Sequence, residues 1–204
     1  SFALSSLASG DGPDGFVING VNSYDQSGFS VSDAGDINGD GFDDIVIGIL
    51  NETYGSNTEG YVIFGSSNSF GASIDLAALN SPGVPGGLVL LGDCNVGFSD
   101  KTSVSAAGDI NGDGVDDLII GKSGDSPYAT YNAGQSYVIF GQSAGFSNTS
   151  IDLTSLDGTN GGLIISGVND YDASGFSVSS AGDVNGDGID DLIIGAPYAQ
   201  SNIG

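Results

Sequence analysis

A segment with oxygen-bearing side chains at alternating positions occurs three times in the sequence. Its first copy, Asp36 to Asp44, has the pattern Asp-x-Asn-x-Asp-Gly-x-x-Asp. Side chains at positions 1, 3 and 5 of a tight turn converge on one point, and glycine at positions 4 and 6 permits the positive φ that such a turn needs. Position 7 offers a backbone carbonyl, and the Asp at position 9 can chelate through both oxygens. Calcium takes about six to eight hard oxygen ligands of this kind, so the pattern predicts a calcium site in each copy.

The same segment has other interpretations. An EF-hand loop places a bidentate acid at position 12 between two helices, whereas position 12 here is Ile47, Ile120 or Ile194, inside an expected strand. Magnesium prefers small octahedral sites that retain water, and zinc and copper favour His and Cys ligands. The chain has no His and one Cys, Cys94, which cannot form an internal disulfide. Asp-Asn-Gly clusters also form plain turns, but three copies that keep all four side-chain ligands favour calcium.

A further acid stands at position 8 of each copy. These residues are Asp43, Asp116 and Asp190. In an alternating turn this position points away from the ion. We therefore expect its carboxylate either to be solvated or to support the site from outside.

Charge and composition restrict the function classes. The 204 residues include 26 Asp and Glu against two lysines and no arginine, for a formal net charge of -24. Nucleic acids and anionic membrane surfaces would be repelled, so neither is an expected partner. Such acidity suits a salty medium or the chelation of hard cations, and its clustering favours chelation. No apolar run of about 20 residues is present, so we expect no membrane span.

The Asp-rich segment belongs to a longer internal repeat. The glycine directly before each copy is Gly35, Gly108 or Gly182, and these glycines are 73 and 74 residues apart. Ser-Val-Ser precedes each copy, at 30–32, 103–105 and 177–179, and an apolar run ending in Gly follows it, at 45–48, 118–121 and 192–195. Two more apolar runs come later in the period, at 61–65 and 137–141 and at 88–92 and 163–167.

These apolar runs predict the fold class. Each is short and bounded by Gly, Asn, Ser or Asp, which is typical of a strand. Because the runs are continuously apolar, we expect several strands to be buried on both faces. No long stretch has the apolar spacing of an amphipathic helix. Four short strands per period predict an all-β fold built from four-stranded antiparallel β-propeller blades.

The phase of the repeat predicts how the chain is divided. Residues 1–7 align with 73–79 and 150–156, so the chain is expected to begin inside a blade, just before a fourth strand. We assign 1–26 to the end of a preceding blade, 27–92 and 93–167 to blades with the first and second calcium loops, and 168–204 to an incomplete blade with the third. About three blades are too few for a propeller, which has about four to eight. We therefore expect a fragment of a longer propeller, or several chains completing one ring.

The loop and its flanks resemble the FG-GAP repeat of integrin α-subunit propellers and their bacterial relatives. The third copy matches best, with Gly175-Phe176-Ser177 before the loop and Gly195-Ala196-Pro197 after it, and the resemblance covers nearly the whole chain. The resemblance implies a bacterial-type member of this family that is extracellular or at the cell surface. It also implies one calcium loop between the first and second strands of each blade. The implied ligands are Asp36, Asn38, Asp40, the Phe42 carbonyl and Asp44; Asp109, Asn111, Asp113, the Val115 carbonyl and Asp117; and Asp183, Asn185, Asp187, the Ile189 carbonyl and Asp191.

The middle copy departs most from the family pattern. It has Lys101-Thr102 where the others have Gly-Phe, and Gly121-Lys122-Ser123 in place of Gly-Ala-Pro. The first copy has Gly48-Ile49-Leu50 at the latter place. Both lysines of the chain thus stand at landmark positions of one blade. Either they form an internal ion pair or contact an acidic neighbour, or they have drifted at tolerated surface positions.

The expected function is not catalytic. Without His there is no Ser-His or Cys-His pair, and nine aspartates are committed to calcium. We expect an extracellular module for adhesion or protein recognition, with Ca²⁺ as a structural clasp in each of three sites. A structural subunit of a surface layer, sheath or filament and a calcium-dependent carbohydrate-binding propeller are open alternatives, because fold does not select among them. Self-assembly or the remainder of the same chain would complete the propeller.

Overall fold

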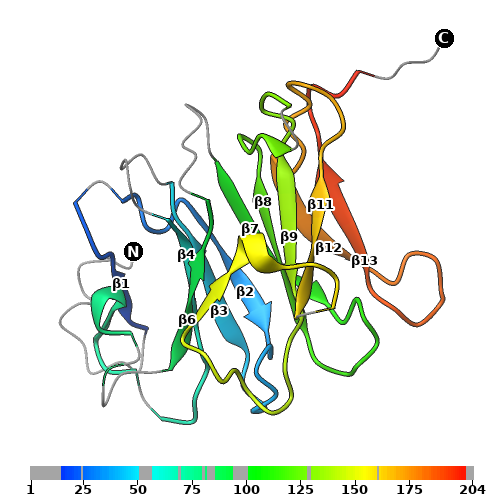
Figure 1. Ribbon diagram of the computed structural model, residues 1–204. Coiled ribbons are helices and arrows are strands. Elements are labelled where there is room, and N and C mark those ends of the chain that lie inside the picture. Colours follow the sequence, from blue (N-terminus) through cyan, green and yellow to red (C-terminus); the bar gives the residue numbers. More distant parts are fainter. Residues whose placement is uncertain are drawn as a thin grey trace, which may run out of the picture.

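The computed structural model describes residues 15–23, 25–50, 57–68, 70–79, 81, 86–93, 101–127, 130–159 and 161–200. Over these residues the chain is all-β, with thirteen strands and two short 3-10 helices (Figure 1). The expected fold class is therefore confirmed. Residues 1–7, used to set the phase of the repeat, and Cys94 lie outside the described residues. The division at residues 27, 93 and 168 stays a prediction.

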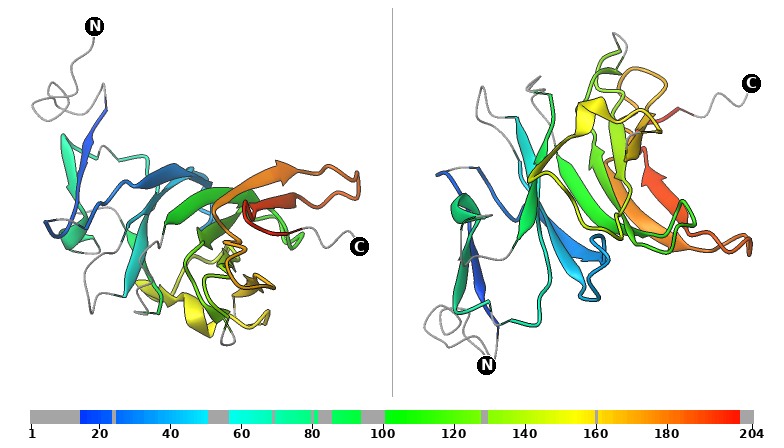
Figure 2. Two further views of the ribbon diagram at one scale, coloured as in Figure 1. Left: turned by 90° about the horizontal axis from the view of Figure 1, so that it is seen from above. Right: turned by 60° about the horizontal axis from the view of Figure 1, so that its bottom comes forward.

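Two sheets repeat the same order of four antiparallel strands. The first contains β2 (Ser30–Gly35), β3 (Asp44–Gly48), β4 (Thr58–Ile63) and β6 (Gly87–Leu91). The second contains β7 (Thr102–Gly108), β8 (Asp117–Lys122), β9 (Gln135–Ile139) and β11 (Gly162–Ser166). A third pairs β12 (Ser177–Gly182) with β13 (Asp191–Gly195). The first strands β2, β7 and β12 contact one another in turn, and the sheets follow in chain order, as blades do (Figure 2).

Two short parallel pairings link one repeat to the chain of the next. β10 (Ser150–Asp152) comes from the second repeat but pairs with β6 of the first sheet, and β5 (Ser73–Asp75) pairs in the same way with β1 (Val17–Asn19). Each linking strand ends at an Asp that caps a 3-10 helix, η2 (Leu76–Ala78) or η4 (Leu153–Ser155). These strands were not predicted, although the recurring Ser-Ile-Asp-Leu was a signal for them.

The central strands β3, β4 and β8 are largely buried because each lies between two neighbouring strands of its sheet. Strand β8 is buried along its whole length. Its side chains alternate, so Leu118 and Ile120 pack with Val62 of the first sheet, whereas Ile119 packs with Val178 of the third. One continuous apolar run therefore serves two cores, as the sequence predicted.

A buried ion network joins the first two sheets at the end of β8. Lys122 is 1% exposed, and its Nζ lies 2.9 Å from Glu59 Oε1 on β4 and 3.0 Å from Asp125 Oδ1. Tyr137 donates its hydroxyl to the other oxygen of Asp125 at 2.6 Å. Burial, together with Asp125, raises the pKa of Tyr137 far above its usual value, so it stays a donor. A buried ammonium needs such compensation, since its desolvation is costly.

The two landmark lysines thus have different surroundings. For Lys122 the internal ion pair is the correct interpretation. Lys101 is exposed, and its Nζ lies 5.0 Å from the centre of the Phe176 ring, which belongs to the next repeat. Both lysines therefore contact a neighbouring repeat, but only Lys122 does so in a buried site.

Replacing Lys122 with Met should lower the free energy of unfolding by about 3–5 kcal/mol, because Glu59 and Asp125 would be left buried without their cation. The matched control, Lys101→Met, removes an exposed cation–π contact and should cost about 0.5–1 kcal/mol. Urea unfolding followed by circular dichroism measures both. Similar losses in the two variants would contradict the structural role assigned to Lys122.

Candidate metal centres

The three Asp-rich loops occupy the same place in successive sheets. They connect β2 to β3, β7 to β8 and β12 to β13. A register shift ends the first strand before each loop, at Gly35, Gly108 and Gly182, whose φ values are 67°, 72° and 66°. Such bulges bend the chain out of the strand, and only glycine adopts this φ without strain. The three loops therefore lie at one end of their sheets.

The carboxylate at position 1 is the centre around which each loop wraps. Asp36 Oδ1 accepts the N–H of Asp40 at 3.0 Å, and its Oδ2 accepts the N–H of Gly41 at 2.8 Å. Asp109 and Asp183 make the corresponding bonds in their own loops. Backbone N–H donation, first from the N–H of Gly188, lowers the pKa of Asp183.

Positions 3 and 5 continue the same wrapping. Asn38 Oδ1 accepts the N–H of Asp40 at 2.9 Å, and Asp40 Oδ1 accepts the N–H of Phe42 at 3.0 Å. The bonds recur at Asn111, Asp113, Asn185 and Asp187. Gly39 and Gly41 have φ of 72° and 90°, as the pattern predicted, and the glycines of the other two loops match them.

The acid at position 9 fastens each loop to its sheet. Asp117 is 0% exposed, accepts the N–H of Ile110 at 3.0 Å, and accepts the N–H of Gly141, beyond β9, at 2.9 Å. Asp44 makes the equivalent bonds in the first copy. Burial raises the pKa of Asp44 and of Asp117 to about 6, although two N–H donors oppose that effect. In the third copy Asp191 accepts from Val184 N–H and Asn185 Nδ2.

The donor set of each loop fits calcium in type, and it reaches six oxygens if the acid at position 9 chelates through both of its own. It comprises carboxylates at positions 1, 5 and 9, an amide oxygen at position 3 and a backbone carbonyl at position 7, from Phe42, Val115 or Ile189. Within the described ranges, however, no group of three acidic side chains lies close enough to hold a metal ion. The carboxylates at positions 1 and 5 accept from N–H groups of their own loop, and those of Asp44 and Asp117 accept from the loop and from a residue beyond the next strand. Since a carboxylate oxygen keeps lone-pair capacity after one hydrogen bond, ligation requires rotation of these side chains toward one point. The ligand assignment therefore stays a prediction.

The acid at position 8 reaches the loop of the preceding repeat. Asp116 Oδ2 accepts the N–H of Asp36 at 3.0 Å, and Asp190 Oδ2 accepts the N–H of Asp109 at 3.0 Å. A side chain at Gly35 would collide with the Asp116 carboxylate, and Gly108 stands in the same relation to Asp190. For Asp116 and Asp190 the structure shows support of a loop from outside, whereas Asp43 is exposed, as expected for a solvated carboxylate. The sequence signal was the doubled Asp at positions 8 and 9, but the partner lies about 80 residues away in the chain.

The comparisons with known proteins agree with this geometry. A family model described as FG-GAP repeat matches residues 29–64, 102–139 and 174–204, and each match contains one Asp-rich loop. The chain belongs to the FG-GAP repeat family. This FG-GAP chain is 33% identical over 164 residues to integrin alpha pat-2 of Caenorhabditis elegans, and 32% identical over 164 residues to integrin alpha pat-2 of Caenorhabditis briggsae. Each alignment covers 79% of this chain but 12% of the relative, so the chain spans a small part of those proteins.

Stability in chelator should fall as the pH rises from 4 to 6. The folded-state pKa of Asp44 and Asp117, about 6, lies above the ordinary value of 3.8, so ionisation opposes folding. The contribution of each protonated carboxyl group to the free energy of unfolding is complete below about pH 4 and is lost as the pH rises through about 6. The loss is roughly 1–2 kcal/mol per group. Urea unfolding in EGTA should show a weaker pH dependence for Asp117→Asn. The control, Asp113→Asn, removes an exposed acid of the same loop, and an equal effect there would contradict the assignment.

The contact made by position 8 can be tested with an internal control. Replacing Asp116 with Ala removes a charged acceptor between repeats and should lower the free energy of unfolding by about 1.5–3 kcal/mol. Asp43 holds the same loop position, is exposed, and accepts no hydrogen bond from the described residues, so Asp43→Ala should cost less than about 0.5 kcal/mol. Thermal and urea unfolding compare the two variants. Equal costs would show that the contact between repeats contributes nothing.

Proposed function

We propose that this FG-GAP chain is a calcium-binding extracellular or cell-surface module for adhesion or protein recognition. The observation that carries the proposal is the threefold recurrence of one loop, with the same ligand types and the same internal hydrogen bonds. A plain turn needs neither three carboxylates nor an amide at these positions. Their repetition in successive sheets supports a role that each repeat needs.

Calcium acts in this proposal as a structural clasp. Each loop carries carboxylates at positions 1, 5 and 9, and those at positions 1 and 5 repel the buried acid at position 9 in the first two loops. A bound divalent cation would offset this repulsion. Position 9 is tied to the sheet and position 1 is tied, through its N–H, to the next repeat. An ion shared by both positions would therefore brace a loop against its sheet and its neighbour. Three ions would change the formal charge from -24 to about -18.

The family supports the recognition role and the location in this proposal. The similar proteins are integrin alpha subunits by name, which supports a protein partner and an extracellular or cell-surface setting. The described residues contain no helix long and apolar enough to cross a membrane. The lack of His supports a binding role over a catalytic one. A subunit of a surface layer, sheath or filament is the alternative, and light scattering of the purified chain in calcium would reveal it as large, regular assemblies.

Chelation should lower the melting temperature. If calcium is present at about ten times its dissociation constant, each site stabilises the fold by about 1.4 kcal/mol, or about 4 kcal/mol for three sites. This corresponds to a melting temperature lower by roughly 10 °C in EGTA, measured by differential scanning calorimetry. The variant Asp36→Asn, Asp109→Asn, Asp183→Asn is the control and should melt at the same temperature in calcium and in EGTA. An unchanged melting curve of the native chain in excess EGTA would refute the structural role of calcium.

A further inference from the structure

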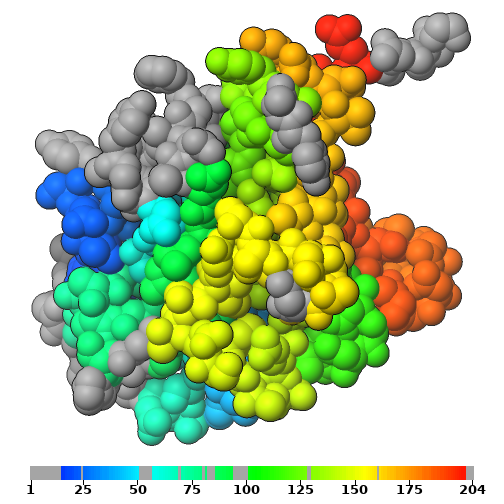
Figure 3. Space-filling model, in the orientation of Figure 1, coloured from blue at the N-terminus to red at the C-terminus, as the bar shows by residue number. Residues whose placement is uncertain are grey.

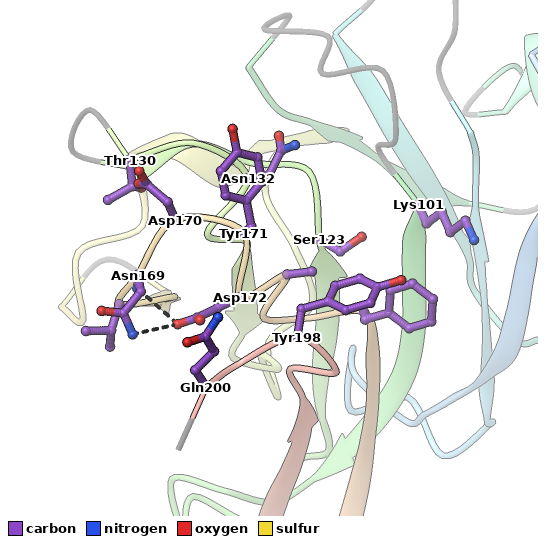
Figure 4. Close-up of a pocket in the computed structure, with 13 residues that line it drawn as sticks. Lys101, Ser123, Thr130, Asn132, Asn169, Asp170, Tyr171, Asp172, Tyr198 and Gln200 are labelled. Carbon is purple, nitrogen blue, oxygen red and sulfur yellow. Dashed lines mark hydrogen bonds between the residues drawn. The ribbon is translucent and has the colours of Figure 1, made fainter. Parts of the chain in front are cut away.

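A groove lies at the other end of the sheets from the Asp-rich loops. It has a volume of about 970 Å³ and lies between the connection from β8 to β9, the connection from β11 to β12, and the segment after β13. Figure 3 shows the first two connections, in lime and orange, together at one end of the molecule. The side chains used below are Lys101, Asn132, Asp170, Tyr171, Asp172, Tyr198 and Gln200 (Figure 4).

Backbone hydrogen bonds hold the two connections together. The N–H groups of Tyr171, Ala173 and Ser174 donate to the carbonyls of Tyr131, Asn132 and Ala133 at 2.7, 3.2 and 2.9 Å. The N–H of Tyr131 also donates to Asp170 Oδ1 at 2.9 Å. The wall of the groove is therefore already formed before a ligand binds, which lowers the entropic cost of binding.

Three residues of this wall have a backbone conformation that favours glycine. Asn132, Tyr171 and Ala173 have φ of 50°, 66° and 53°. Each such residue costs about 1–3 kcal/mol and persists only where its surroundings hold it. Of the four non-glycine residues with positive φ among those described, three line this groove. The backbone strain is thus concentrated in this groove. There the Tyr171 side chain is 60% exposed, and its ring stacks on the ring of Tyr131 with the ring centres 6.3 Å apart.

The groove combines exposed aromatic rings with polar groups that lack protein partners. Tyr171 and Tyr198 are 60% and 66% exposed. In the described part of the chain, the side-chain amides of Asn132 and Gln200 make no hydrogen bond. Asp172 is 7% exposed, and one of its carboxylate oxygens accepts both bonds from Asn169, which leaves the other oxygen free to accept from a ligand.

We propose that the groove binds a short neutral saccharide. A pyranose ring has an apolar face of C–H groups that fits a tyrosine ring, and vicinal hydroxyl groups that both donate and accept hydrogen bonds. The amides of Asn132 and Gln200 match donors and acceptors alike, and the free oxygen of Asp172 matches a hydroxyl donor. The groove is lined by one cation, Lys101, and two carboxylates, Asp170 and Asp172, so its own charge and the net charge of the chain both disfavour an anionic ligand. The volume lies within the range of about 300–1,000 Å³ that small ligands occupy.

This inference goes beyond the proposed function and does not depend on it. The groove and the loops to which calcium is assigned lie at opposite ends of the sheets, so saccharide binding in the groove does not require the assigned calcium sites. Failure of saccharide binding would leave the effect of EGTA on the melting temperature unchanged. Failure of calcium stabilisation would leave the groove chemistry unchanged.

The proposal is tested by applying the 204-residue chain, in calcium, to an array of neutral oligosaccharides. These have two to four units of glucose, mannose, galactose, xylose or N-acetylglucosamine. Sialylated and sulfated oligosaccharides serve as acidic comparators. We expect binding to at least one neutral class and none to the acidic ones. Isothermal titration with the best neutral oligosaccharide then gives the affinity.

Glycine substitutions separate binding from folding. Because glycine is favoured at positive φ, Tyr171→Gly and Asn132→Gly should keep the melting temperature while lowering the affinity about tenfold or more. Ala173→Gly makes the same backbone change without removing a contact group, and it should bind within about threefold of the native chain.

Three results would overturn the proposal. One is the absence of binding to every neutral oligosaccharide. Another is an affinity that Tyr171→Gly leaves unchanged. The third is a peptide, selected from a random peptide library, that binds more tightly than every oligosaccharide and loses its binding in Tyr171→Gly, since that would identify the groove as a peptide site.

Discussion

Hydrogen bonds from backbone N–H groups to aspartate oxygens organise this molecule. They wrap each loop around Asp36 or its equivalents, fasten the loop to its own sheet through position 9, and join it to the next repeat through position 8. An N–H group supplies only a partial positive charge. The raised pKa of the buried acids Asp44 and Asp117 shows that two such donors do not fully compensate a carboxylate removed from water. A divalent cation is the compensation that the proposed function supplies.

The sheets depend on one another because each shares its side chains between two cores. Along β8 alternate residues enter different interfaces, so neither face can be left without a neighbour. The ion network of Lys122 adds a polar contact at the same junction. It specifies which strand ends must meet, because displacement would leave the buried Glu59 carboxylate without its cation and the ammonium with Asp125 alone.

The sequence predicted the features that recur with the period and left out those that depend on distant partners. The four strands of a repeat and the turn glycines could be located because hydrophobic runs and Gly positions are local signals. Strands β5 and β10 were missed because three residues carry little periodicity, and they are held by a strand of another repeat. The partner of Lys122 is 63 residues away, so the sequence could only state the alternatives. The groove was not predicted, since it requires two connections and the unusual φ of Tyr171.

The parallel pairing of β10 with β6 has a consequence for cooperativity. In many repeat proteins each unit contacts its neighbour only through packed surfaces, so units at the ends can fray separately. Here a segment of the second repeat completes the edge of the first sheet, and residues 150–152 must leave that sheet before either repeat can open. Loss of one repeat therefore exposes unpaired backbone in the other. Such an arrangement favours a single unfolding transition over a stepwise one.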